Sequence, residues 1–162
     1  MTTWLKFGVI AAGALAAALA CSPASAEILA ATTTEAAFIS TSMTDVAIPV
    51  RQNGVKVLKF TTTGPGKTLV KITYNAECVV LAPRGTYLSI RIEVDGVPTD
   101  PLAAGGDFAF CSAIDNAGAT WMAVSRQSLS KVSRGEHLVR VFGRLNGPGT
   151  WAVDDSSLVV ER

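Results

Sequence analysis

Histidine is nearly absent from this 162-residue sequence, which contains only His137, together with three cysteines. A structural zinc site takes four cysteine or histidine ligands, so this supply argues against a zinc protein. The sequence has no Gly-x-Ser-x-Gly motif, the turn that presents the nucleophilic serine of many hydrolases. It also has no Asp-x-Asp-x-Asp loop of the kind that binds calcium. The familiar signatures of metal sites and serine hydrolases are therefore missing.

Long hydrophobic runs are confined to the N-terminus. Residues 1–26 carry one charge, Lys6, then an apolar run over residues 7–20 and a final Ala-Ser-Ala, a sequence that signal peptidase cleaves. The apolar run is shorter than the ~20 residues that cross a bilayer, and no basic stop follows it, so we expect no membrane span. We predict a signal peptide at 1–26, cleavage before Glu27, and export to the periplasm or the cell exterior.

Charge of one sign is not in excess either. Without residues 1–26 the chain has 136 residues, with thirteen basic and thirteen acidic side chains. This balance excludes the basic surface that binds nucleic acid or anionic lipid, and also the acidic surplus of a solvating tail. The length suits one domain, which we place at residues 45–162. Residues 27–44 are either a first strand or a loose lead-in.

Two cysteines, Cys78 and Cys111, remain in a chain that is sent to an oxidising compartment. We predict one disulfide between them, which closes a loop of about 30 residues and stabilises the fold by on the order of 3 kcal/mol. Zinc ligation and a catalytic thiol are the alternatives, and both need partners that the chain hardly supplies. Cys21 is not expected to carry a lipid, because Ala18 stands where a lipoprotein signal has a large aliphatic residue.

Apolar and polar residues alternate with a period of two along most of the remaining chain. The even-numbered residues are apolar from Leu88 to Val94, ahead of the turn residues Asp95-Gly96, and again from Val70 to Val80, which turns Cys78 inward. In a regular strand, Phe108 and Phe110 would lie on one face and Cys111 on the other. Either only one of these faces packs inside, or a bulge changes the alternation. No segment after residue 26 has the 3.6-residue apolar period of a helix.

Turn signals divide these alternating segments into short strands. Asn53-Gly54 between two apolar segments predicts a β-hairpin, because both residues tolerate positive φ. Pro49 places its strand at a sheet edge. Further loops are expected at 98–106, 115–120, 133–136 and 146–149, where Gly, Pro, Asn and Asp are dense. About eight or nine short strands predict an all-β antiparallel sandwich, and we expect a jelly roll.

The C-terminal residues 129–161, LSKVSRGEHLVRVFGRLNGPGTWAVDDSSLVVE, resemble the closing strands of secreted jelly-roll sandwiches. They combine a Gly-x-His turn, a strand of alternating valines, a Gly-rich hairpin and Asp-Asp before Leu-x-Val. Carbohydrate-binding modules of the jelly-roll kind, complement-type domains and tumour-necrosis-factor-like trimer domains have similar endings, as do exported bacterial proteins. The resemblance covers about a fifth of the chain and implies an architecture rather than a ligand site.

Few residues are arranged for catalysis. His137 follows a turn and has the parity of Val139, so we interpret it as a strand-start histidine bound to a turn partner rather than a general base. A glycosidase needs two carboxyl groups across a cleft, whereas Glu77, Glu93 and Asp95 all take the solvent side of their strands. A Ser-His-Asp set can still assemble through space. We therefore expect a protein without enzymatic activity.

Two tryptophans and two arginines are candidates for binding a ligand. Trp121 and Trp151 each begin a strand after a glycine-containing loop, where an indole can stack on a sugar ring or a partner. Closing the ends of the core is their alternative role, and the one that the sequence favours. Arg140 and Arg144 share one strand face and are candidates for a basic patch, although solvated strand faces carry arginines without any function.

Asp154 and Asp155 lie between two short apolar runs, 151–153 and 158–160. Asp and Ser side chains hydrogen-bond to nearby backbone groups, so we interpret residues 154–157 as a turn or bulge. Calcium, bound by the two carboxylates and loop carbonyls, is the alternative and the only cofactor that the sequence suggests.

The sequence thus predicts an exported, non-catalytic binding or surface-interaction module. Its partner would be a protein or a glycan outside the cell, with no nucleic acid involved. A structural subunit of a homo-oligomeric surface or appendage assembly is the second hypothesis, and it rests on the resemblance to trimer domains. A small secreted hydrolase is the third.

Overall fold

The computed structural model describes residues 26–101, 108–114 and 120–162. The predicted signal peptide, with Cys21, lies outside these residues apart from Ala26, and so do most residues of the predicted loops at 98–106 and 115–120. The described part of the chain contains eleven strands and one short 3-10 turn. None of its helical structure is long or apolar enough to cross a membrane.

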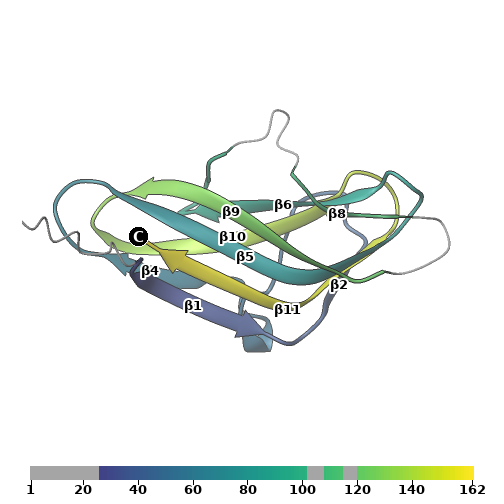
Figure 1. Ribbon diagram of the computed structural model, residues 1–162, viewed down its shortest axis with the longest axis horizontal. Helices are drawn as coiled ribbons and strands as arrows, with labels where there is room; N and C mark the ends of the chain where they lie inside the picture. Colours follow the sequence, from purple (N-terminus) through teal and green to yellow (C-terminus); the bar gives the residue numbers. More distant parts are fainter. Residues whose placement is uncertain (1–25, 102–107, 115–119) are drawn as a thin grey trace, which may run out of the picture.

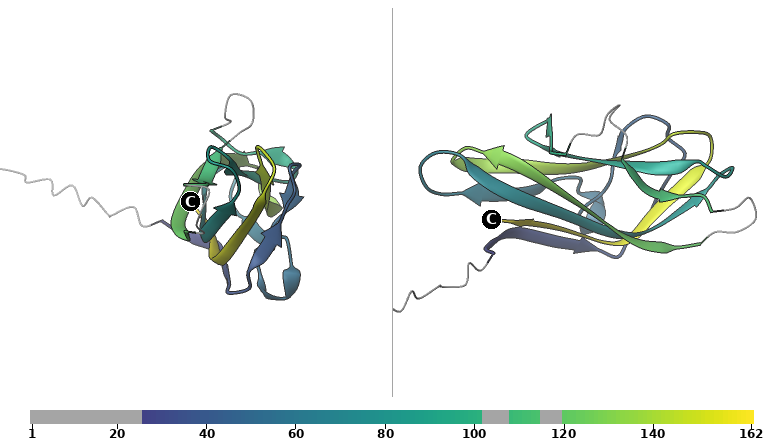
Figure 2. Two further views of the ribbon diagram at one scale, coloured as in Figure 1. Left: turned by 90° about the vertical axis from the view of Figure 1, so that its right-hand side faces the viewer. Right: turned by 45° about the horizontal axis from the view of Figure 1, so that its top comes forward.

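The strands form two antiparallel sheets that lie face to face as two layers (Figures 1 and 2). The first sheet has the order β1-β11-β5-β9, and β2 follows β1 along the same edge of β11. Its strands are β1 (Ile28–Thr34), β2 (Phe38–Ser40), β5 (Thr68–Leu81), β9 (Met122–Val132) and β11 (Thr150–Glu161). Residues 27–44, a first strand or lead-in by sequence, therefore contain β1 and β2.

The second sheet is built around β10 and β6, which pair with each other. Its strands are β3 (Val46–Ala47), β4 (Leu58–Thr62), β6 (Tyr87–Val94), β7 (Val97–Pro98), β8 (Ala109–Ser112) and β10 (Gly135–Leu145). Both β3 and β4 pair with the same edge of β10, while β7 and β8 both pair with the outer edge of β6.

Three edge strands are thus interrupted, each by a short excursion of the chain. When β1 with β2, β3 with β4, and β7 with β8 are each counted as one strand, eight strands remain in two four-stranded sheets, which is a jelly roll. The predicted all-β antiparallel sandwich is confirmed, and the described strands exceed the expected eight or nine because of these breaks. An interrupted edge offers no continuous strand for another chain to pair with, which disfavours edge-to-edge aggregation.

The predicted hairpin around Asn53-Gly54 is wrong in its pairing. Both residues have positive φ, 66° and 76°, as expected for a tight turn. However, β3 and β4 pair with β10 and not with each other. Residues 48–57 are therefore an excursion from a single edge strand. Pro49 lies at the break in this edge, where the loss of its amide hydrogen breaks no hydrogen bond of the sheet.

The core lies between the two sheets and follows the alternation in the sequence. The even-numbered residues 70–80 of β5 and 88–94 of β6 are all buried, as their period of two predicts. The φ angles of Asp95 and Gly96 are 53° and 82°, and these residues form the predicted turn between β6 and β7. The best-patterned segments of the sequence thus become the central strands.

A disulfide joins Cys78 of β5 to Cys111 of β8, with their Cα atoms 6.5 Å apart. This confirms the predicted bridge, which connects the two sheets through the core. Phe110 and Cys111 are adjacent in sequence yet both buried. A register shift between Leu88 and Ser89, where β8 pairs with β6, provides the bulge that lets both side chains face inward.

The outer face of the second sheet is less exposed than the alternation predicts. Glu93, expected on the solvent side, is 9% exposed, and Ser89 on the same face is 3% exposed. The Ser89 hydroxyl accepts a hydrogen bond from the Phe108 amide at 2.9 Å, and the Arg91 guanidinium pairs with Glu93. The long Arg91 side chain and the chain segment at Phe108 therefore cover part of this face.

Candidate functional site

The outer face of the first sheet carries small and polar side chains across its middle. The register of the three central strands places their outward residues side by side. These residues are Asn75 and Glu77 on β5, Ala123 and Ser125 on β9, and Asp154 and Ser157 on β11. None of them is large and apolar, so this part of the sheet is open to solvent and rich in hydrogen-bonding groups.

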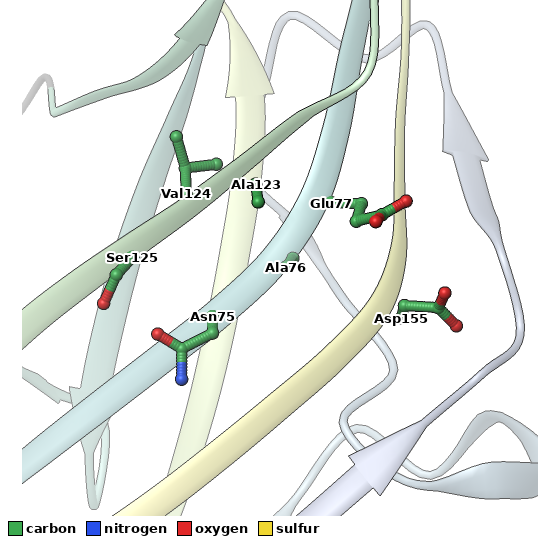
Figure 3. A pocket seen from close by; sticks show the side chains of 7 residues that line it. All are labelled: Asn75, Ala76, Glu77, Ala123, Val124, Ser125 and Asp155. Atoms are coloured by element: carbon green, nitrogen blue, oxygen red, sulfur yellow. The ribbon is translucent and has the colours of Figure 1, made fainter.

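A shallow groove of about 410 Å³ lies on this face (Figure 3). Its lining consists of Asn75, Ala76, Glu77, Ala123, Val124, Ser125 and Asp155. Because the side chains of Ala123 and Ser125 are short, the strands themselves form the floor of the groove. Glu77 reaches from β5 toward β11, on which Asp155 lies (Figure 3).

The polar groups of the groove are held by the sheet. The Asn75 Nδ2 atom donates a hydrogen bond of 3.1 Å to the Ser157 hydroxyl, which fixes the amide across the seam between β5 and β11. Glu77, Ser125 and Asp155 are exposed. Groups in fixed positions on a sheet lose little conformational freedom when a ligand binds, so they suit recognition of a ligand with many hydroxyl groups.

Asp154 and Asp155 form a bulge in β11. The pairing of β11 with β5 shifts between Asp154 and Ser157, Asp155 has a φ of 40°, and its amide donates a 2.9 Å hydrogen bond to Asp154 Oδ1. This is the turn or bulge that the side chains predict. The described residues include no group of three His, Cys, Asp or Glu side chains placed to hold a metal ion. Calcium binding at this bulge stays the alternative interpretation.

Three carboxylates gather at the β11 side of the groove. Glu77 lies directly opposite Asp154 in the ladder, an arrangement of like charges that is unfavourable, and Asp155 is next in the chain. Lys71 is the only basic residue of β5; it lies about 20 Å from Glu77 along the strand. Its ammonium pairs with Glu161. The groove is therefore electronegative.

An apolar strip adjoins the groove at the end nearest Trp121. Ala152 lies between Ile39 on β2 and Val79 on β5, and the alternation places all three on the outer face, where Ile39 is exposed but Ala152 and Val79 are buried. Trp121 directly precedes β9, whose first residue pairs with Cys78, so the alternation places Trp121 beside Val79 and on the same face as Ala123. Trp121 is 45% exposed. The indole is therefore an exposed aromatic surface on the outer face beside the groove, although Trp121 is not one of the residues that line it.

Trp151 is in a different situation, because it is fully buried. Its ring packs edge-on against Phe38 at 5.5 Å between centroids. A Cβ atom on Gly143 would lie 2.8 Å from Trp151 Cη2, so the indole needs the space that this glycine leaves. Trp151 is thus a core residue that cannot reach a ligand, and the two tryptophans that look alike in sequence have different surroundings.

Arg140 and Arg144 lie on the outer face of the second sheet, away from the groove. Arg140 is opposite Glu93 in the ladder, and the Arg144 Nε atom lies 3.9 Å from Asp45 Oδ1. Arg91, between them on β6, pairs with Asp45 at 2.8 Å and lies 4.7 Å over the Phe142 ring. Acidic and basic groups alternate here, so the two arginines belong to a mixed-charge surface rather than a basic patch.

His137 is buried at the start of β10 and has a partner on each ring nitrogen. Nδ1 donates to Asp95 Oδ2 at 2.7 Å, and Nε2 donates to the Ser133 carbonyl at 2.8 Å. Burial lowers the pKa of His137, but these hydrogen bonds and the charge of Asp95 outweigh it and hold the pKa above its ordinary value. The Asp95 carboxylate also accepts from the Leu138 amide at 2.9 Å. His137 therefore ties two turns together, which matches the predicted turn partner.

No protein-family model matches the sequence, and no curated protein sequence does. Among solved structures, the fold is similar to dimeric latent PorU from Porphyromonas gingivalis, with a TM-score of 0.41 and 11% identity over 85% of this chain. The chain spans 13% of that protein's length. It is also similar to the CBM22-1 xylan-binding domain of Paenibacillus barcinonensis Xyn10C, with a TM-score of 0.34 and 11% identity over 84% of this chain and 96% of that domain. Both similarities are too distant to assign a ligand.

Sequence reasoning did not find the groove. Of its residues, only Asp155 was a candidate, as a calcium ligand. Asn75 and Ser125 are common polar residues of solvated strands, and nothing in their local sequence separates them from others. The usable signal was the alternation itself, since it assigns Asn75 and Glu77 to the outward face of β5. Which strands flank β5 on that face depends on the sheet order, which the sequence does not specify.

Proposed function

We propose that this protein is an exported, non-catalytic carbohydrate-binding module, and that the groove of the first sheet is its binding site. The single observation that carries the proposal is the combination of an exposed indole, Trp121, with a row of fixed polar groups on one sheet face. An indole stacks on the apolar face of a sugar ring, while carboxylate, amide and hydroxyl groups bond to its hydroxyls.

The shape of the groove supports an extended ligand. It is shallow, and the alternation along β9 leads from Ser125 and Ala123 in the groove to Trp121 beside it, so a small molecule would remain largely solvated in it. A polysaccharide chain can instead place successive rings on the indole and along the polar row. Export is supported by the Cys78–Cys111 bridge, since such bonds persist in oxidising compartments, and by the N-terminal sequence.

Isothermal titration with a panel of neutral oligosaccharides tests the proposal. The wild-type protein should bind at least one of them, and Trp121→Ala should weaken that binding at least tenfold with little change in melting temperature. Val97→Ala is the matched control, because Val97 is an exposed apolar side chain, 65% accessible, on the other sheet. It should bind like wild type.

Trp151→Ala provides the contrast with a structural tryptophan. Its removal from the core should cost about 3 to 5 kcal/mol of folding free energy. Absence of binding to every glycan tested, neutral or charged, would overturn the proposal. Binding that survives Trp121→Ala unchanged would overturn the assignment of the site.

A further inference from the structure

The charged side chains around the groove are all acidic, and this affects which glycans the groove can bind. Glu77, Asp154 and Asp155 stand along it, and no cationic side chain is among its lining residues. Within the described residues, none of the three carboxylates has an ion-pair partner. Only Asp154 has a hydrogen bond, which it accepts from the Asp155 amide.

The position of this charge is imposed by the fold. The ladder places Glu77 opposite Asp154, and the bulge turns Asp155 out of the alternation into the groove lining. Unpaired like charges this close repel one another, so they are stabilised by a cation that lies between them. An anion in the same place would be repelled by all three.

Trp121 indicates that the occupant is a ring-bearing ligand rather than a bare ion. By the alternation, the indole and the carboxylates lie on the same sheet face. Glu77 is two residues farther along and one strand over, and Asp154 and Asp155 are two to three residues farther along and two strands over, so the separations are about 8 to 14 Å. A sugar unit that stacks on Trp121 therefore places a substituent of the next unit near Glu77. A protonated amine there makes charge-assisted hydrogen bonds to the carboxylates.

We propose that the groove selects glycans by charge, and that its preferred ligand is a polysaccharide of amino sugars with free, protonated amines. This inference rests on the proposed glycan-binding function. Neutral glycans bind through stacking and hydrogen bonds alone, and glycans that carry uronate groups are rejected.

Three hexasaccharides of similar size test the inference: glucosamine with free amines, N-acetylglucosamine, and galacturonic acid. At about pH 6 and low salt, where Asp, Glu and the amines are charged, the amine form should bind about tenfold more tightly than the acetylated form. The uronate form should not bind. The preference for the amine should shrink as salt is added, because exposed charge interactions are screened.

Glu77→Gln combined with Asp154→Asn and Asp155→Asn removes the charge while it keeps the shape and the hydrogen-bonding oxygens, including the Asp154 oxygen that accepts from the Asp155 amide. This triple variant should bind the free-amine and acetylated hexasaccharides within about twofold of each other. Glu136→Gln is the control, since it removes one exposed acidic charge from the other sheet, where Glu136 pairs with Lys59 at 2.9 Å. It should retain the preference of wild type.

The outcomes separate the two proposals. Equal binding of the amine and acetylated forms, or binding of the uronate form, overturns charge selection and leaves glycan binding standing. A preference that survives in the triple variant shows that the carboxylates do not cause it, which also overturns charge selection. If none of the three oligosaccharides and no member of the neutral panel binds, both proposals fail.

Discussion

Reduction of the Cys78–Cys111 bridge is expected to lower the melting temperature by roughly 10 to 15 °C. The two cysteines are 33 residues apart in the chain, so the bridge removes the entropy of a loop of that length from the unfolded state. The chain-entropy relation puts this at about 4 kcal/mol, and for a domain of this size each kcal/mol corresponds to about 3 to 4 °C. The bridge also joins the two sheets, so its loss affects the whole sandwich.

The assay is thermal unfolding followed by circular dichroism, with and without a thiol reductant. Cys78→Ala combined with Cys111→Ala is the control, because a protein without the bridge should melt at the same temperature under both conditions. Mass spectrometry of unreduced protein after alkylation should find both cysteines protected. Two alkylated thiols in native protein from an oxidising compartment, or a melting temperature indifferent to the reductant, would refute the reasoning.

Three further predictions concern His137, the bulge and Gly143. The pKa of His137 is raised above 6.5 and that of Asp95 is lowered below 3.8 by their pairing, despite the opposing effect of burial on each. The pair therefore contributes its full stabilisation of the folded state between pH 3.8 and pH 6.5. This contribution is lost as the pH rises through the folded-state pKa of His137, and it is also lost as the pH falls through the folded-state pKa of Asp95. His137→Gln should flatten this profile of denaturant stability; an unchanged profile contradicts the pairing. Calcium or a chelator should leave the melting temperature unchanged, whereas a rise with calcium would support a site at Asp154 and Asp155. Gly143→Ala should cost about 1 to 3 kcal/mol in urea unfolding, because its Cβ would overlap Trp151; a neutral effect would show that the core yields there.

Much of the fold could be predicted because the alternation of apolar and polar residues identifies the strands, and the two cysteines of an exported chain identify the disulfide. The even-numbered residues 70–80 and 88–94 are apolar and buried without exception, and a strand with one face on the core is the structure that this period predicts. Cys78 faces inward on one of these strands, which left Cys111 as its partner in an oxidising compartment. The sandwich and its bridge follow from these two features.

Pairing was harder to predict than strand content. Asn53-Gly54 does form a tight turn, and the Val50 amide donates to the Val55 carbonyl across it at 2.9 Å, but the strands on either side pair with the same edge of β10 and not with each other. Local sequence specifies positive φ and does not specify the strand that accepts the next hydrogen bonds. The same limit applies to Glu93, whose outward parity was right but which is buried and pairs with Arg91 of its own strand.

The tryptophans show why a site is harder to predict than a fold. Trp121 and Trp151 both follow glycine-containing loops and both precede apolar residues, so their sequence contexts are nearly equivalent. Trp121 is 45% exposed and Trp151 is 0% exposed. The difference depends on which side of the sheet each indole takes, and that is set by pairing with strands that are distant in the sequence. Trp121 directly precedes β9 and is exposed, whereas Trp151 faces Gly143 across the core.

Glycan binding on the outer face of the first sheet is tested most directly by nuclear magnetic resonance. A neutral oligosaccharide that binds in the titration panel is added stepwise to isotope-labelled protein, and amide and indole shifts are followed. The shifts should concentrate on the Trp121 indole and on the backbone of residues 75–77 and 123–125, while the buried Trp151 and the exposed Arg140 on the other sheet stay unchanged. Shifts that cluster around Arg140, or that leave Trp121 unaffected, would contradict this account of the binding site.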